Sequence, residues 1–149
     1  MGYNKICFIT KRELHMIRKL LIVDDNEMNL KLLRHMLSND YLVLEASDGE
    51  EALNIMKKNV RGISAVLLDL VMPKMDGYEV LKYMKKDDVL SQIPVIVATG
   101  SNEEGAEVKA LTLGANDLFD RLDASGDLRV DRTAGLDMIY PYIFYFTRI

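Results

Sequence analysis

The chain has 149 residues, which is long enough for one domain with a substantial hydrophobic core and too short for two full domains. Its 49% hydrophobic and 28% charged residues are ordinary for a soluble globular protein, and no apolar run approaches the roughly 18 residues of a membrane span. The formal net charge of −4 argues against a surface that binds nucleic acid, and the lack of a membrane span argues against a membrane protein. The single cysteine, Cys7, cannot form an internal disulfide, and the first residues lack an apolar secretion signal, so we expect a cytoplasmic protein.

The first predicted element is the apolar strand Lys19–Val23, which ends in two carboxylates, Asp24 and Asp25. Residues 26–37 follow with leucines at helical spacing, and either Asp25 or Asn26 is available to cap that helix. The sequence therefore begins its periodic part with a strand whose carboxyl end is acidic, followed by an amphipathic helix.

A second strand is predicted at 41–46, and a second helix follows it directly. We expect Ser47 to begin this helix and to form a capping box with Glu50. Strands that alternate with helices in this way are typical of units in which consecutive strands run parallel.

The third strand, 63–68, is an apolar run of the kind that is buried on both faces inside a parallel sheet. Asp69 ends it, and a loop with Pro73 and Gly77 leads to a third helix at 78–86. Open α/β sheets bind their ligands in the crevice beyond the carboxyl ends of the strands. Asp69 therefore stands where such a sheet carries functional groups, although an aspartate there can also simply cap a turn.

The last periodic part contains a strand at 93–98 that ends in Thr99. A helix at 103–113, closed by Gly114 in the C′ position, and a strand at 117–121 follow it. Five strands that alternate with helices predict an α/β fold with a doubly wound, five-stranded parallel sheet.

Asp24, Asp25 and Asp69 all follow apolar strands, so parallel pairing of the two strands would bring three carboxylates to one rim of the sheet. Carboxylates this close repel one another unless a cation neutralises them. Mg²⁺ prefers such oxygen ligands and keeps several waters that a phosphoryl group can displace. A divalent metal beside an exposed carboxylate nucleophile suggests phosphoryl chemistry.

Three motifs occur in order: Asp-Asp after the first strand, Leu-x-Asp-x-x-Met-Pro-x-Met-Asp-Gly around Asp69, and Val-Ala-Thr at 97–99. This pattern resembles the receiver domain of response regulators in two-component signalling systems, over roughly residues 17–121. The resemblance implies a flavodoxin-like fold with strand order 2-1-3-4-5. It also implies that the protein is a phosphoprotein and a signalling module rather than an enzyme, because the only reactions it catalyses are its own Mg²⁺-dependent phosphorylation and dephosphorylation.

The resemblance assigns a role to each site residue. Asp69 would be the phosphoacceptor, taking a phosphoryl group from a sensor histidine kinase or a phosphotransfer protein. Asp24, Asp25 and Asp69 would hold Mg²⁺ together with the backbone carbonyl of Val71. The Thr99 hydroxyl would donate a hydrogen bond to a phosphoryl oxygen and so switch a partner-binding face. The resemblance leaves open whether a second copy of the chain, forming a homodimer, is one of the partners.

The sequence departs from the family pattern near its end. Arg121 stands where the family has a lysine after the fifth strand, and these two cations are not interchangeable in a tight pocket. Leu118 takes the position of the switch aromatic, and Gly100 follows Thr99 in place of alanine. Arg121, Leu118 and the absence of the family's amphipathic fifth helix support an alternative: a degenerate receiver that acts as a phosphorylation-independent interaction domain.

We divide the chain into a leader at 1–16, a receiver domain at 17–122 and an atypical tail at 123–149. The tail lacks an amphipathic period and ends in an aromatic run, so it is expected to replace the family's fifth helix or to begin a linker to an output domain. A haloacid-dehalogenase-like phosphohydrolase is disfavoured because that family has an aspartate where this chain has Val71. Nucleotide-binding glycine motifs are absent from the sequence.

Overall fold

The computed structural model describes residues 19–39, 41–99 and 105–120, with the backbone alone at 99, 107 and 117–120. The predictions for the 1–16 leader, for Gly100 and Arg121 and for the 123–149 tail lie outside the described residues. Within the described ranges, no helix is long and apolar enough to cross a membrane.

Strands and helices alternate along the described chain, as the sequence predicted. In chain order they are β1 (Lys19–Val23), α2 (Glu27–Leu37), β2 (Leu42–Ala46), α3 (Gly49–Lys58), β3 (Ile63–Asp69), α4 (Gly77–Lys86), the short 3-10 helix η1 (Leu90–Gln92), β4 (Val95–Thr99), α5 (Ala106–Thr112) and β5 (Asp117–Asp120).

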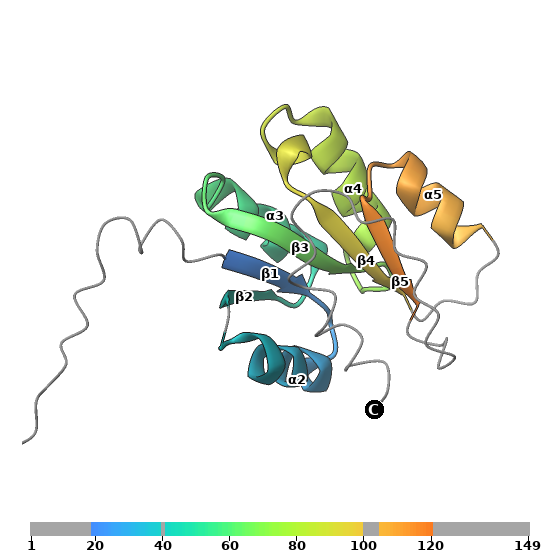
Figure 1. Ribbon diagram of the computed structural model, residues 1–149. Coiled ribbons are helices and arrows are strands. Elements are labelled where there is room, and N and C mark those ends of the chain that lie inside the picture. Colours follow the sequence, from blue (N-terminus) through green and yellow to red (C-terminus); the bar gives the residue numbers. More distant parts are fainter. Residues whose placement is uncertain (1–18, 40, 100–104, 121–149) are drawn as a thin grey trace, which may run out of the picture.

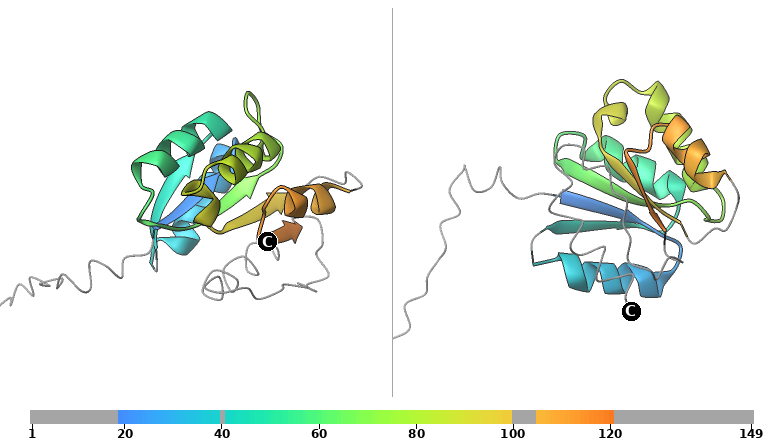
Figure 2. Two further views of the ribbon diagram at one scale, coloured as in Figure 1. Left: turned by 90° about the horizontal axis from the view of Figure 1, so that it is seen from above. Right: turned by 45° about the vertical axis from the view of Figure 1, so that its right-hand side comes forward.

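The strands form one parallel sheet in the order β2-β1-β3-β4-β5 (Figure 1). Among the described helices, α2 alone lies on one face of this sheet, whereas α3, α4 and α5 lie on the other (Figure 2). The predicted flavodoxin-like α/β fold with a parallel sheet is therefore confirmed for β2, β1, β3 and β4. The backbone of β5 pairs with β4 and forms the far edge.

Alternate residues of the central strands pack into two separate hydrophobic cores, because successive side chains of a strand point to opposite faces. In β1, Leu21 and Val23 pack with the residues of α3 and α4, whereas Leu20 and Ile22 pack with the leucines of α2. All four side chains are buried, which explains why β1 reads as a continuous apolar run rather than as an alternating pattern.

The helix caps correct one prediction and decide another. Asn26, not Asp25, caps α2, since its side chain accepts hydrogen bonds from the backbone N–H groups of Met28 and Asn29. The predicted capping box of Ser47 and Glu50 is wrong. Helix α3 begins one residue later, so the side chain of Asp48 accepts from Glu51 N at 2.9 Å, and Glu51 in turn accepts from Ser47 N and Oγ. Both serine and aspartate can cap, and here the carboxylate occupies the cap position.

The end of α5 has the glycine cap that the sequence predicted. Gly114 has φ 103°, a left-handed conformation that glycine adopts without steric cost. The N–H of Gly114 bonds to the carbonyl of Leu111, and that of Ala115 bonds to the carbonyl of Ala110, which is the hydrogen-bond pair of a Schellman motif. The predicted start of this helix, at residue 103, lies outside the described residues.

Candidate functional site

The register of the sheet brings three strand ends together. Val23 pairs with Leu68, so Asp24 leaves β1 beside Asp69, the last residue of β3. Asp69 in turn pairs with Ala98, the residue before Thr99 at the end of β4. The carboxyl ends of β1, β3 and β4 therefore meet at one edge of the sheet, where open α/β folds bind their ligands.

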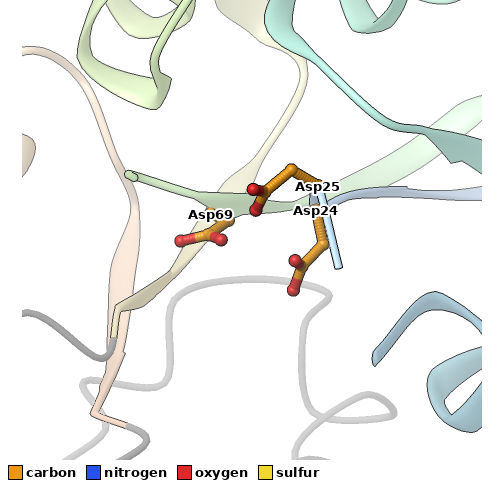
Figure 3. A group of neighbouring side chains, drawn as sticks. All are labelled: Asp24, Asp25 and Asp69. Atoms are coloured by element: carbon orange, nitrogen blue, oxygen red, sulfur yellow. The ribbon is translucent and has the colours of Figure 1, made fainter. Parts of the chain in front are cut away.

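Three carboxylates gather at this edge and form what we call the acidic pocket: Asp24, Asp25 and Asp69 (Figure 3). One carboxylate oxygen of each lies within 4.8 Å of the others. Asp24 and Asp69 are buried, with 1% and 7% of their surface exposed, whereas Asp25 is exposed. Charged side chains are almost never buried to this extent without a partner or a metal, so the arrangement fits a site for a hard divalent cation.

Hydrogen bonds hold Asp24 in place from the helix that follows it. The backbone N–H of Asn26 donates to Asp24 Oδ1 at 2.9 Å, and Asn29 Nδ2 donates to Oδ2 at 3.1 Å. The backbone N–H of Asp24 also donates to the carbonyl of Ala46, at the end of β2. Both oxygens of this buried carboxylate are therefore oriented by the first turn of α2.

The loop between β3 and α4 positions Asp69. The backbone N–H of Val71 donates to Asp69 Oδ1 at 3.2 Å, and the N–H of Gly77 donates to the carbonyl of Leu70 at 3.0 Å. A Cβ on Gly77 would overlap the carbonyl oxygen of Asp69 and lie 2.8 Å from Leu70 Cα. Only glycine therefore lets the start of α4 approach the end of β3 this closely.

The same loop is attached to the start of α3. Lys74 adopts a left-handed conformation with φ 65°, and its Nζ lies 3.5 Å from Asp48 Oδ2. The backbone N–H of Gly49 donates to the carbonyl of Met75 at 3.3 Å. The pKa of Asp48 is lowered, chiefly by the hydrogen bond from the backbone of Glu51 and also by the charge of Lys74. The loop that carries Val71 is thus tied to two helices.

The structure brings together the three predicted metal-ligating carboxylates and places Val71 in the adjoining loop, with 65% of its surface exposed. Thr99 ends β4 at the same edge, but its side chain is not among the described atoms. Arg121 and the side chain of Leu118 likewise lie outside the described part of the chain. Their predicted roles stay predictions.

Two supporting residues were missed by the sequence reasoning. Asn29 holds Asp24, and its position in the first turn of the helix that follows the acidic strand end could have suggested this contact. Lys74 holds the loop through Asp48, and no local pattern indicates that contact because the two residues belong to different strand–helix units.

The response regulator receiver domain is the family whose model matches this chain, over residues 20–125. This chain belongs to that family. The match includes all three carboxylates of the acidic pocket, the loop after Asp69 and the β4 end at Thr99.

Several regulatory proteins are similar to this receiver domain. It is 39% identical over 103 residues to the alkaline phosphatase synthesis transcriptional regulatory protein PhoP of Bacillus subtilis, covering 68% of this chain and 41% of PhoP. It is 36% identical over 93 residues to the polar-differentiation response regulator DivK of Brucella anthropi, covering 62% of this chain and 74% of DivK. The chain thus spans about two fifths of PhoP, and 37% of the transcriptional regulator ycf27 of Guillardia theta.

Solved structures show the same fold. The CheX-CheY-BeF3-Mg²⁺ complex from Borrelia burgdorferi aligns with a TM-score of 0.65 at 26% identity, over 85% of this chain and 87% of that one. The chemotaxis response regulator CheY4 of Vibrio cholerae aligns with a TM-score of 0.64 at 26% identity, over 70% and 86%. The receiver domain is therefore a response-regulator module of the kind that takes part in two-component signalling.

Proposed function

We propose that this receiver accepts a phosphoryl group on Asp69 from a phosphohistidine of a sensor histidine kinase or a phosphotransfer protein, in the cytoplasm. The observation that carries the proposal is the acidic pocket, in which Asp24, Asp25 and Asp69 lie within 4.8 Å of one another. Receiver domains in general interact with such partners. The phosphorylation then switches a face of the domain that binds a protein partner or a second copy of this chain.

In this reaction one oxygen of Asp69 attacks the phosphorus, a P–O bond forms, and the P–N bond to the partner's histidine breaks. The leaving imidazole keeps the bonding electron pair. Val71 N, which donates to Asp69 Oδ1, keeps the carboxylate oriented for this attack. The chain therefore supplies the nucleophile and its orientation and turns over no separate substrate.

Mg²⁺ fits the donor set of the pocket, which consists of carboxylates. Asp24, Asp25 and Asp69 would hold it with the carbonyl of Val71, and the bound ion would offset the charge on the transferred phosphoryl oxygens. Asn29 and the backbone of Asn26 fix Asp24 for this role. The structure solved for the related Borrelia burgdorferi protein contains BeF3 and Mg²⁺, which supports a similar pocket here.

Thr99 and Arg121 complete the proposed site. The Thr99 hydroxyl would donate to a phosphoryl oxygen from the end of β4, one residue past the partner of Asp69 in the sheet. Arg121 follows β5 and would supply the positive charge that the family's lysine provides, through a planar guanidinium in place of a compact ammonium.

The test is incubation of the full chain with acetyl phosphate and Mg²⁺, followed by intact mass spectrometry. We expect one phosphoryl group on the parent protein and none on Asp69→Asn. Asp88→Asn, which removes an exposed carboxylate away from the pocket, is the matched control and should be phosphorylated like the parent. Phosphorylation of Asp69→Asn, or a parent protein that never gains mass, would overturn the proposal.

A second candidate is a receiver that binds partners without phosphorylation. Arg121 in place of the lysine and Leu118 in place of the switch aromatic favour it. A parent protein that is phosphorylated but binds its partner equally well with and without phosphate would support this candidate. Phosphate-dependent binding would refute it.

A further inference from the structure

Strand β2 forms one edge of the sheet, and among the described residues it has a neighbouring strand on one side only, β1 (Figure 1). The carbonyl of Ala46 accepts a hydrogen bond from the N–H of Asp24, so the backbone of Ala46 faces β1. Backbone groups of successive residues in a strand point to opposite sides, so Leu44 also faces β1, whereas Val43 and Glu45 face away from it. The free edge of β2 therefore presents the N–H and C=O groups of Val43 and Glu45.

Strand β2 lacks the features that usually prevent an edge strand from pairing. Natural edge strands often carry lysine, proline or a β-bulge for this purpose. β2 contains neither lysine nor proline, and its five residues pair with β1 without a shift in register. Its one charged residue, Glu45, forms an ion pair with Arg34 of α2 at 3.4 Å, and Leu42 is 47% exposed. The edge is therefore open to a further strand.

We propose that β2 pairs in an antiparallel arrangement with β2 of a second copy of this chain, around a two-fold axis at Leu44. In an antiparallel ladder, residues that form a hydrogen-bonded pair exchange both of their N–H···O bonds. With the axis at Leu44, Val43 lies opposite Glu45 of the second copy, and Glu45 lies opposite Val43 of the second copy. Every N–H and C=O group that the two free edges present is then paired, and the two sheets become one.

The residues on either side of the strand select this register. The next residues whose backbone would face the free edge are Tyr41 and Ser47, but their N–H groups already donate within the domain, at 3.0 Å and 2.8 Å. An axis at Val43 would need the N–H of Tyr41. An axis at Glu45 would need the N–H of Ser47 and would set two glutamates directly opposite each other, which destabilises a strand pair. The axis at Leu44 needs neither group.

The helices on both faces of the sheet fit the same axis. Helices α2 and α3 each contact β1 and β2, so each would lie about two strand spacings, or about 10 Å, from its copy, which is an ordinary distance for packed helices. The first turn of α2 contains the acidic Glu27 and its last turn the basic Arg34, and α3 has Glu51 and Lys58 in the same places. Because the axis sets each helix antiparallel to its copy, acidic first turns lie beside basic last turns on both faces. This charge complementarity favours a second copy of the chain as the partner.

The dimer leaves the acidic pockets free. Antiparallel pairing directs the carboxyl ends of the strands in the two copies toward opposite ends of the joined sheet, so the two pockets lie apart. The pairing uses no residue of the acidic pocket and requires no phosphorylation, and it therefore goes beyond the proposed function.

Amide exchange measured for single residues by NMR on the full chain tests the proposal. Sedimentation first identifies concentrations at which the chain is monomeric and dimeric. On dimerisation we expect the N–H groups of Val43 and Glu45 to exchange at least about tenfold more slowly, and that of Leu44, which faces β1, to change much less. A chain that stays monomeric up to about 1 mM, or a dimer with unchanged exchange at Val43 and Glu45, would overturn the proposal. Equal protection in monomer and dimer would assign the free edge to another part of the same chain and would equally overturn it.

Two substitutions at Val43 then test the register. Both remove the same partly buried valine, so each is the matched control for the other. Val43→Glu sets a carboxylate opposite Glu45 of the second copy, twice in each dimer, whereas Val43→Lys sets an ammonium group there. Val43→Glu should therefore dimerise at least about tenfold more weakly than Val43→Lys in sedimentation experiments. Equal dimerisation of the two variants, or the reverse order, would refute the register, and none of these measurements depends on phosphorylation of Asp69.

Discussion

Replacing Gly77 with alanine tests whether the close contact between α4 and β3 sets the position of Asp69. The added Cβ would overlap the Asp69 carbonyl oxygen and lie 2.8 Å from Leu70 Cα, closer than real Cβ contacts occur. Gly77 is not among the described glycines with positive φ, so its backbone conformation is open to alanine and the effect is purely steric. Both obstacles are backbone atoms, which means that the start of α4 or the end of β3 must move.

The size of the effect follows from these contacts. Overpacking of a well-packed interior costs about 1–3 kcal/mol. The hydrogen bond from Gly77 N to the Leu70 carbonyl, 3.0 Å long, would also be strained, and such a bond contributes about 1 kcal/mol. We therefore expect a loss of about 2–3 kcal/mol, which lowers the urea midpoint by about 1–2 M. Movement of Asp69 relative to Asp24 should weaken Mg²⁺ binding by about tenfold or more, as changes next to metal ligands typically do.

Urea denaturation followed by circular dichroism measures the first effect, and calorimetric titration with Mg²⁺ measures the second. Gly62→Ala is the control, because its added Cβ would meet only the flexible side chain of Lys19, at 3.2 Å. Parent-like stability and Mg²⁺ affinity in Gly77→Ala would refute the steric reasoning. Equal losses in Gly62→Ala would show that the effect does not come from the contact with β3.

Three further predictions concern the pocket and its surroundings. Asp25→Asn should weaken Mg²⁺ binding by about 10–100-fold in calorimetry, whereas Asp88→Asn should not, and equal affinities would contradict the metal assignment. The pKa of Asp48 is lower in the folded protein than in the unfolded chain, where it has the ordinary value of about 3.9. The ionised carboxylate therefore stabilises the fold at pH values above about 3.9, and this stabilisation is lost as the pH falls through the lower, folded pKa. Asn at position 48 keeps an oxygen that can cap the helix but cannot ionise. In Asp48→Asn, the urea midpoint should therefore fall less steeply below about pH 4 than in the parent protein, and an identical pH profile would contradict this role of Asp48. Val71→Asn should speed the decay of phospho-Asp69 at least about tenfold after the phosphoryl donor is removed. The exposed valine methyls cannot hydrogen-bond an attacking water, whereas an asparagine amide can. Equal decay rates in the two proteins would refute this.

The strands and the acidic pocket were predictable because both depend on short-range features of the sequence. The apolar runs of β1 and β3 have no alternative to burial on both faces, and each run ends in an aspartate. Because the two strands are parallel neighbours in a register that pairs Val23 with Leu68, Asp24 lies beside Asp69. The cap of α3 was less predictable, since Ser47 and Asp48 are adjacent and both are good capping residues.

What holds the pocket in shape depends on contacts that no local pattern contains. Lys74, whose backbone is in the left-handed conformation, forms an ion pair with Asp48, which belongs to another strand–helix unit. Next to this ion pair, the backbone N–H of Gly49 donates a hydrogen bond to the carbonyl of Met75. These contacts join residues of different strand–helix units, so the sequence indicates which residues carry the charge but not which residues hold them in place. They also join the loop after Asp69 to the start of α3. The loop after Asp69 therefore contacts α3 and leads into α4, and both helices lie on the face of the sheet opposite α2 (Figure 1).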